Sequence, residues 1–410
     1  MSGVRVPPPP HQIMDPEEQL AVLKKKAVEI IREGEVVAKL SKGKPLRVKL
    51  GIDASGPDIH LGFAVVLKKL REFQELGHTA VLIVGDFTGK IGDPSGRSKT
   101  RPQLTETEVK ENLKRYSEQI FRILDPERTE FRFNSEWLDR LTAKDIVDIT
   151  ARCTVARMLE RDDFSIRYRE NRPIGLHELL YPVFQGYDSV AVEADIELGG
   201  TDQKFNLLVG RELQRSFGQE GQVVMLMPLL EGLDGVRKMS KSFDNYIGIT
   251  DSPEEMFGKL MSIPDDLILK YFELTTEMDS EGVGKIDSRL RSGENPRDLK
   301  DELAGRVVSL YHSPEAALAA RAEFVRVFRE KDLPEKMPIH AIAGEKVWVV
   351  RLLCDLGFAA SNSEARRLLA QGAVTVDDEK ITDPDHDLKI ENEVIVKVGK
   401  RKFARVIPGE

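Results

Sequence analysis

The sequence predicts an α/β fold in which a domain built on an open parallel sheet precedes a helical domain and a small α+β module. Residues 46–53 have a strand pattern, residues 60–76 a helical pattern, and residues 79–86 an almost wholly apolar strand pattern. This order predicts a right-handed crossover between buried parallel strands. A Rossmann-like sheet is therefore expected, with ligands at the carboxyl ends of its strands.

The composition indicates a globular protein of two or three domains. The chain has 410 residues, of which 40% are hydrophobic and 32% charged. No apolar run reaches membrane-spanning length, and the first residues lack the apolar core of a signal peptide. Cys153 and Cys354 lie far apart, without the spacing of metal ligands, which favours a cytoplasmic protein and argues against a disulfide framework or zinc site. The net charge of −8 gives no global indication of nucleic-acid binding.

The first 35 residues are interpreted as an arm followed by a helix. Residues 1–14 include a run of four prolines and are expected to be extended. Asp15 and Pro16 then provide an N-cap and a first-turn proline. The apolar spacing up to Ile31 predicts one helix that ends at Gly34.

Residues 36–248 form the predicted sheet domain. Within it, residues 105–188 are mostly helical in pattern and are interpreted as an insertion between two halves of the sheet, interrupted by the apolar-aromatic residues 130–133. A further apolar strand is predicted at residues 223–227.

Four helix starts at prolines indicate a helical domain over residues 249–330. They occur at Pro253, Pro264, Pro296 and Pro314. Residues 331–345 are expected to be a linker. Residues 346–410 form the small module, with a helix at residues 363–370 and strands at 373–376 and 393–399.

Lys238 and Lys241 lie in a polar loop, residues 236–245, that follows the strand at 223–227. Two flexible ammonium groups can close over a polyphosphate and stabilise charge that develops in a transition state. The alternative is an ordinary solvated basic loop.

A second motif, His60-Leu61-Gly62-Phe63, opens a helix directly after a strand and turn. Glycine allows a close approach to the backbone, the helix N-terminus favours anions, and histidine can donate to a phosphate oxygen. By itself it could be a surface histidine. Together with the lysine loop, the motif resembles the two signatures of class I aminoacyl-tRNA synthetases.

Tyr181, Gln185 and Asp188 share one face of a predicted helix, where they could receive a ligand with an ammonium and a hydroxyl group. A buried polar network is the alternative. The segment resembles the tyrosine-specifying helix of tyrosyl-tRNA synthetases, and residues 85–96 and 199–203 resemble that family as well.

The resemblance implies tyrosine activation by ATP, with Mg²⁺ on the ATP phosphates, and transfer of the tyrosyl group to tRNA(Tyr) by a homodimer that uses the inserted helices as its interface. The implied tyrosine-binding residues are Asp93, Tyr181, Gln185, Asp188 and Gln203. The implied ATP-binding residues are Asp53, Ser55, His60, Gly62, Gly200, Asp202, Lys238 and Lys241, of which His60, Gly62, Lys238 and Lys241 would be catalytic.

Three residues depart from the family pattern. Phe63 stands where many members have a second histidine or an asparagine, and it cannot donate a hydrogen bond to the ribose. Lys49 stands where many bacterial members have a tyrosine that touches the substrate phenol, and Glu197 replaces a frequent glutamine.

The last module resembles a small RNA-binding module found in a ribosomal protein and at the C-terminus of bacterial tyrosyl enzymes. The candidate phosphate contacts are Arg366, Arg367, Lys397, Lys400, Arg401 and Lys402. The alternative is a solvated basic edge.

Two other functions stay open at this point. One is a tryptophanyl-tRNA synthetase, against which the residues at 181, 185 and 188 argue. The other is a synthetase-derived RNA-binding protein without catalysis, which Phe63 makes conceivable and the intact lysine loop disfavours.

Overall fold

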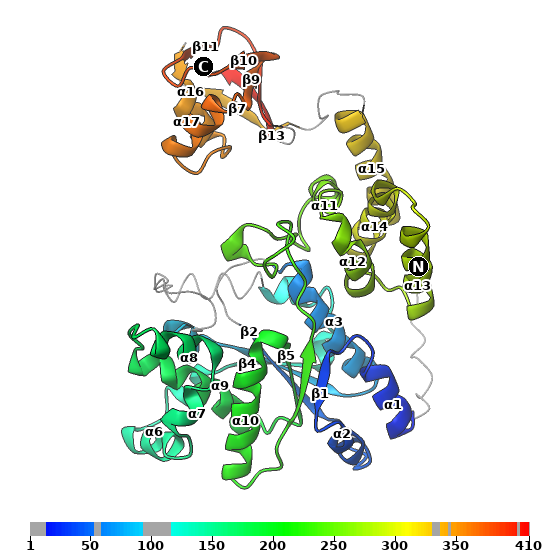
Figure 1. Cartoon of the computed structure of the whole chain (residues 1–410), viewed down its shortest axis with the longest axis vertical. Coiled ribbons are helices and arrows are strands. Elements are labelled where there is room, and N and C mark those ends of the chain that lie inside the picture. Colours follow the sequence, from blue (N-terminus) through cyan, green and yellow to red (C-terminus); the bar gives the residue numbers. More distant parts are fainter. Residues whose placement is uncertain are drawn as a thin grey trace, which may run out of the picture. The chain divides into compact units, whose positions relative to one another are not determined.

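The computed structural model describes residues 14–52, 59–92, 116–329, 337–342, 346–399 and 402–409. The chain divides into two compact units, Met1–Pro314 and Glu315–Glu410 (Figure 1). The predicted proline-rich arm lies almost wholly outside the described residues, and so does the segment 331–336 of the predicted linker. In the described ranges, no helix combines the length and apolarity needed to cross a membrane.

The first unit is organised around a six-stranded sheet in the order β1-β6-β5-β2-β3-β4. Strands β2 to β6 are parallel, and the sixth strand, β1, runs antiparallel at the edge beside β6. The strands are β1 (Glu29–Ile31), β2 (Arg47–Ile52), β3 (Thr79–Val84), β4 (Thr129–Phe133), β5 (Ile196–Gly200) and β6 (Val223–Met227).

The chain order of these strands reverses at β2. From β2 the chain proceeds outward through β3 to β4, and it then returns to place β5 on the other side of β2. The carboxyl ends of β2 and β5 therefore flank a topological switch point, where open parallel sheets form their ligand-binding crevice.

Three helices bring polar residues to this crevice. They are α3 (Leu61–Glu75), α9 (Leu176–Ala191) and α10 (Lys204–Ser216). Helices α9 and α10 pack closely because Gly186 faces Gly210: a Cβ atom added to Gly186 would lie 3.1 Å from the Gly210 nitrogen. Larger residues would separate the helices and displace the side chains that α9 presents.

The predicted N-terminal helix is wrong beyond its first two turns. Helix α1 (Pro16–Leu23) has the expected Asp15 cap, but the chain then forms β1 and α2 (Glu33–Leu40). Lys26 and Arg32 have φ angles of 61° and 72°, in the left-handed region, and so interrupt the helix.

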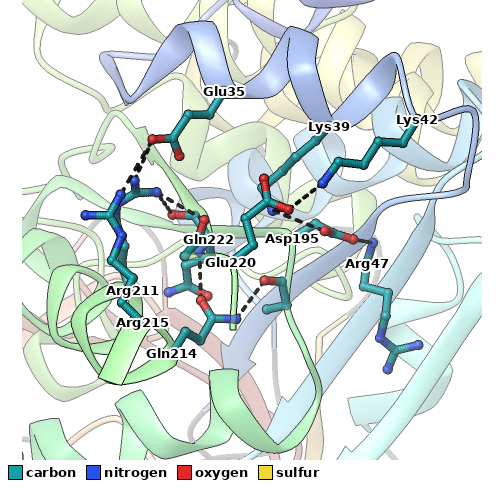
Figure 2. A network of polar contacts seen from close by, with 12 residues as sticks. Glu35, Lys39, Lys42, Arg47, Asp195, Arg211, Gln214, Arg215, Glu220 and Gln222 are labelled. Carbon is teal, nitrogen blue, oxygen red and sulfur yellow. Dashed lines mark hydrogen bonds and ion pairs between the residues drawn. The ribbon is translucent and has the colours of Figure 1, made fainter. Parts of the chain in front are cut away.

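Ion pairs hold α2 against the rest of this unit (Figure 2). The buried Lys39 ammonium lies 3.2 Å from Asp195, just before β5, and Glu35 lies 2.7 Å from Arg211 on α10. These tertiary contacts outweigh the apolar spacing from which one long helix was predicted.

The prediction of a single insertion at residues 105–188 is also wrong in part. Strand β4 lies within it, but pairs in parallel with β3 and extends the main sheet. The surrounding helices are α5 (Ser135–Leu138), α6 (Ala143–Thr150), α7 (Val155–Met158) and α8 (Asp162–Arg169). The edge position explains why β4 has a mixed, half-buried pattern.

The helical region has the predicted starts at Pro253 and Pro296, each preceded by a side-chain cap. At Pro264 the chain instead enters a 3₁₀ turn that continues into α12. The helices are α11 (Pro253–Leu260), α12 (Ile268–Thr275), α13 (Ser280–Arg291), α14 (Pro296–Tyr311) and α15 (Pro314–Arg329). Single 3₁₀ turns occur at Thr88–Lys90, Pro126–Arg128, Thr201–Gln203, Lys241–Phe243 and Asp265–Leu267.

The second unit contains a five-stranded sheet in the order β10-β9-β12-β13-β7 and a two-stranded sheet of β11 and β8. The predicted helix and strands correspond to α17, β9 and β12. The elements are β7 (Ile339–Ile342), β8 (Lys346–Trp348), α16 (Val349–Asp355), α17 (Asn362–Ala370), β9 (Val374–Val376), β10 (Glu379–Ile381), β11 (Asp387–Lys389), β12 (Val394–Val398) and β13 (Lys402–Pro408). The sheet begins earlier than residue 346, because β7, inside the predicted linker, pairs in parallel with β13.

Candidate functional site

A cavity of about 320 Å³ lies at the switch point of the main sheet. All predicted site residues of the first unit that belong to the described ranges line it: His60, Gly62, Tyr181, Gln185, Asp188, Gly200, Asp202, Gln203, Lys238 and Lys241. Asp53, Ser55 and Asp93 lie outside the described residues. The structure thus brings together side chains that follow β2, β5 and β6 with side chains from α9.

His60 is the N-cap of α3, and its Nδ1 accepts a hydrogen bond of 3.2 Å from the Phe63 N–H. Burial, together with the charges of Lys241 and Lys238, lowers the pKa of His60 to about 4. The imidazole is therefore neutral near pH 7. With Nδ1 accepting, Nε2 carries the proton and can donate a hydrogen bond to a ligand oxygen.

Asn245 shapes the lysine loop. Its buried side chain accepts from the Ser240 N–H at 2.8 Å and donates to Asp234 Oδ2 at 3.1 Å. The loop also contacts the other signature motif, because the Gly62 N–H donates to the Met239 sulfur at 3.3 Å. Met239 is buried between them, so the two motifs form one wall of the cavity.

The two lysines have different partners. Lys238 Nζ lies 2.5 Å from Asp202 Oδ2, which belongs to the turn after β5. Lys241 Nζ lies 3.4 Å from the Tyr116 hydroxyl and 5.1 Å from the centre of its ring. A residue larger than Gly200 would clash here, since an added Cβ atom would lie 2.6 Å from Asp202 Oδ1.

Asp188 is a buried carboxylate in the lining of the cavity. Trp137 Nε1 donates to its Oδ1 at 2.8 Å, and Asn134 Nδ2 donates to its Oδ2 at 3.3 Å. Burial raises its pKa to about 7, while Lys49 and these two donors oppose the rise and Glu197 adds to it. Near neutral pH, this carboxylate is poised between its charged and neutral forms.

Asn206 on α10 holds two of the predicted residues. Its Nδ2 donates to Gln185 Oε1 and to Gln203 Oε1, both at 3.0 Å. Arg161 in turn donates to Asn206 Oδ1 at 3.1 Å, and both side chains are buried. Asn206 therefore fixes which ends of the two glutamines face the cavity.

Sequence reasoning missed the residues that support this site. Asn134, Trp137, Arg161 and Asn206 are single polar residues far apart in the chain, and no local spacing distinguishes them. The departures also have a structural context: Phe63 and Glu197 line the cavity, whereas Lys49 lies beneath it, fully buried against Glu197.

The structure describes four of the six basic residues predicted to contact RNA phosphates in the second unit. Arg366 and Arg367 are exposed on α17, near Asp385 and Glu364 respectively. Lys397 lies over the Phe403 ring, and Lys402 donates to the Phe358 carbonyl at 2.8 Å. Lys400 and Arg401 lie outside the described residues.

No group of three or more His, Cys, Asp or Glu side chains suited to a metal ion occurs in the parts of the chain that the structure covers.

Comparisons with known proteins place the chain in a family. Residues 41–329 match the family model for class I tRNA synthetases of the tryptophan and tyrosine group, and residues 330–406 match the tyrosine–tRNA ligase SYY-like C-terminal domain. The tyrosine–tRNA ligase of Moorella thermoacetica is 57% identical over 95% of both chains. That of Thermotoga maritima is 54% identical over 97% of this chain and 99% of its own.

Solved structures agree on the fold. The tyrosyl-tRNA synthetase of Archaeoglobus fulgidus, complexed with L-tyrosine, has a TM-score of 0.60 at 24% identity and covers 75% of this chain and 100% of its own. The matched family models and the close full-length relatives together show that this chain belongs to the tyrosine–tRNA ligases, a family of class I aminoacyl-tRNA synthetases.

Proposed function

We propose that the cavity at the switch point is where this ligase joins tyrosine to ATP and releases pyrophosphate, before the tyrosyl group passes to the terminal ribose of tRNA(Tyr). One observation carries the proposal: a buried carboxylate, Asp188, and two lysines, Lys238 and Lys241, line the same cavity. The carboxylate suits a phenol, and the lysines suit a polyphosphate.

The tyrosine would lie with its phenol at Asp188. Tyr181, Gln185 and Asp93 would hold its α-amino group, and Gln203 would lie near its carboxylate. Asn206 orients both glutamines by donating to their oxygens. The Gln203 amide nitrogen can then donate to the carboxylate, and the second lone pair of Gln185 Oε1 can accept from the ammonium. A ring without a hydroxyl group, such as that of phenylalanine, would give the buried Asp188 one hydrogen bond fewer than tyrosine does, which is costly.

The ATP would lie between the signature motifs. Asp202 and Gly200 would contact the ribose, and Asp53 and Ser55 would lie around the ATP phosphates or on the side of the tyrosine α-amino group. His60 and Gly62 would lie against the nucleotide, and His60 would act as a neutral donor because its pKa is about 4. Lys238 and Lys241 would neutralise the departing pyrophosphate, and Mg²⁺ would enter as part of the ATP substrate.

The reaction needs no covalent enzyme intermediate. The tyrosine carboxylate attacks the α-phosphorus of ATP, and the bond to the pyrophosphate oxygen breaks. Catalysis then consists of holding the two substrates in line and stabilising the charge on the leaving group.

We also propose that two copies of the chain form a homodimer and that the enzyme acts in the cytoplasm. Large apolar side chains are exposed on the helices α6 to α9, at Val147, Val155, Ile166, Tyr168 and Leu176. Exposed apolar residues of this size, where they adjoin on the surface, are typical of a protein interface. Sedimentation equilibrium on the wild type and on Leu176→Asp would test it, with a monomeric wild type contradicting the dimer.

The experiment that tests the catalytic proposal is ATP–pyrophosphate exchange with tyrosine, with tryptophan and without amino acid. We expect exchange with tyrosine only. Exchange with tryptophan would indicate a tryptophanyl enzyme, and no exchange with either would indicate a protein that has lost catalysis.

A further inference from the structure

We propose that Lys49 and Glu197 act as a positioning pair beneath the tyrosine pocket, in which the lysine fixes Asp188 and the two opposite charges together set how well it accepts the substrate phenol. The inference rests on the proposed role of Asp188. It gives a function in specificity to two residues that depart from the family pattern.

Lys49 holds α9 on both sides of Asp188. Its ammonium donates to the Gln185 carbonyl at 2.9 Å and to the Ser189 hydroxyl at 2.7 Å. These partners lie three residues before Asp188 and one residue after it. A single fully buried group on β2 therefore fixes the rotation of α9 at the turn that presents Asp188.

Glu197 on β5 completes the arrangement. Its Oε1 lies 2.8 Å from Lys49 Nζ, and its Oε2 accepts from Ser189 at 3.1 Å and from Gln222 Nε2. Glu197 Oε1 has no hydrogen-bond partner of good geometry, so its stabilisation depends on the lysine charge. Both side chains are almost completely inaccessible, at 0% and 1% exposure.

Stability alone does not account for such a pair. Removing two charges from water costs several kcal/mol per ion, and an apolar pair of similar volume is often as stable or more stable. A pair next to a recognition carboxylate can have another effect, since each charge acts on the protonation of its neighbour. Lys49 favours the ionised form of Asp188, and Glu197 opposes it.

Among the described groups around Asp188, Lys49 and Glu197 are the charges that act most on its carboxylate. Trp137 and Asn134, from α5 and the end of β4, are neutral donors. Ser189 and Gln222 are neutral as well. His60, Asp202, Lys238 and Lys241 line the same cavity at the position proposed for ATP, and the charges that act most on Asp188 are those of Lys49 and Glu197.

The test compares the pH dependence of kcat/KM for tyrosine in Lys49→Met, Glu197→Gln and the double variant. An ionised Asp188 accepts the phenol, so kcat/KM for tyrosine should fall as pH decreases through the pKa of Asp188. Exchange measured from about pH 5 to about pH 9 locates this acid limb in the free enzyme.

We expect the two single variants to move the acid limb in opposite directions along the pH axis. Lys49→Met and the double variant should move the acid limb to higher pH, by about one unit or more for the single variant. Glu197→Gln should move it to lower pH, because Lys49 then faces Asp188 without its counter-ion. Activity with phenylalanine has no phenol to place and should not show this limb.

Lys39→Met is the matched control. Lys39 on α2 is equally buried and ion-paired with Asp195 (Figure 2), but it does not line the cavity. The Lys39→Met variant should be less stable but should have the acid limb at the wild-type pH. The Lys49→Arg variant should also have the limb near the wild-type pH, because arginine keeps the positive charge.

Exchange by the wild type with tyrosine tests the proposed activity. The role of Lys49 and Glu197 is tested only by the difference in the pH of the acid limb between variants. Activity that decreases equally at all pH values in the three variants would overturn the proposal and leave the pair a purely structural role. Should Lys49→Met not fold, Glu197→Gln decides alone: a limb moved to lower pH supports the proposal, and an unmoved limb contradicts it.

Discussion

Lys238 on the signature loop and Asp202 in the turn after β5 form an ion pair across the cavity, with 2.5 Å between nitrogen and oxygen. The pair joins the loop to the sheet at the position proposed for the ribose of ATP. Asp202 thus holds the first lysine of the loop directed into the cavity rather than toward solvent. The structure thus places Lys238 in the cavity, where the sequence motif alone could only suggest it.

Replacing either loop lysine should slow adenylate formation. We expect Lys238→Ala or Lys241→Ala to reduce the single-turnover rate by about 10²–10³, as the loss of one donor to developing charge commonly does. Lys285→Ala removes an exposed lysine paired with Glu281 on α13 and should leave the rate unchanged. Equal rates in all three variants would exclude the proposed clamp.

Removing the charge of Asp188 should weaken selection for tyrosine. In Asp188→Asn, the ratio of kcat/KM for tyrosine to that for phenylalanine should fall by about 10- to 100-fold, because a hydrogen bond to a charged group is lost. Asp195→Asn is the control, since Asp195 lies at the amino end of β5, whereas the cavity lies at the carboxyl ends of the strands. A ratio equal to that of the wild type would mean that another residue reads the phenol.

Asn206 should matter for tyrosine affinity although it is not proposed to touch the substrate. Asn206→Ala frees Gln185 and Gln203 to rotate, so the KM for tyrosine should rise by roughly tenfold with a smaller change in kcat. Gln219→Ala, which removes a bond from Gln219 to the Val190 carbonyl outside the cavity, should leave KM unchanged. A kcat effect without a KM effect would contradict this reading.

Stability should fall in mild acid because of His78. Its Nδ1 accepts from the Leu46 N–H and its ring faces Gln19, so the buried ring is satisfied only when neutral. Burial lowers its pKa to about 4, from 6.5. The unfolded chain therefore binds the proton first, and stability is lost as pH decreases from about 6.5 toward 4, by about 1–2 kcal/mol at pH 5.

Urea unfolding of the wild type and of His78→Gln at about pH 7 and pH 5 checks this expectation. Glutamine can accept from Leu46 and donate to Gln19 without titrating. The variant should lose less stability between the two conditions, and an identical loss would assign the acid sensitivity to other groups.

The second unit should bind tRNA through exposed charge. Arg366→Ala and Arg367→Ala should each weaken tRNA binding and reduce the slope of log affinity against log salt by about one. ATP–pyrophosphate exchange, which needs no tRNA, should not change. Lys346→Ala at the start of β8 is a basic control, and a salt slope unaltered in the arginine variants would exclude them from the interface.

How much of the fold follows from the sequence depends on the element. Strands β3 and β6 are almost wholly apolar, and β2 has a mixed strand pattern with Arg47 and Lys49; the sequence predicts all three. Strand β5, Ile196–Gly200, was not assigned, because it contains the buried Glu197 and two glycines. Glu197 is buried there as an ion pair with Lys49, which no apolar pattern reveals.

The site divides in the same way. Residues in compact motifs, such as Lys238 and Lys241, could be named from their spacing. Asn134, Trp137 and Asn206 could not, since only the folded chain brings them to Asp188 and to the glutamines. Lys49 was noticed as a departure, but its partner Glu197 lies on a different strand, so their pairing needed the structure.

Strand β1 has a consequence for biosynthesis. Glu29 pairs with Leu226, so the first strand to leave the ribosome has its partner at the far end of the sheet domain. At about 5–20 residues per second, Glu29 waits roughly 10 to 40 seconds until Leu226 is made. The N-terminal segment is therefore among the last parts of the sheet to become ordered. Until β1 pairs with β6, the nascent chain must remain soluble with the edge of β6 unpaired.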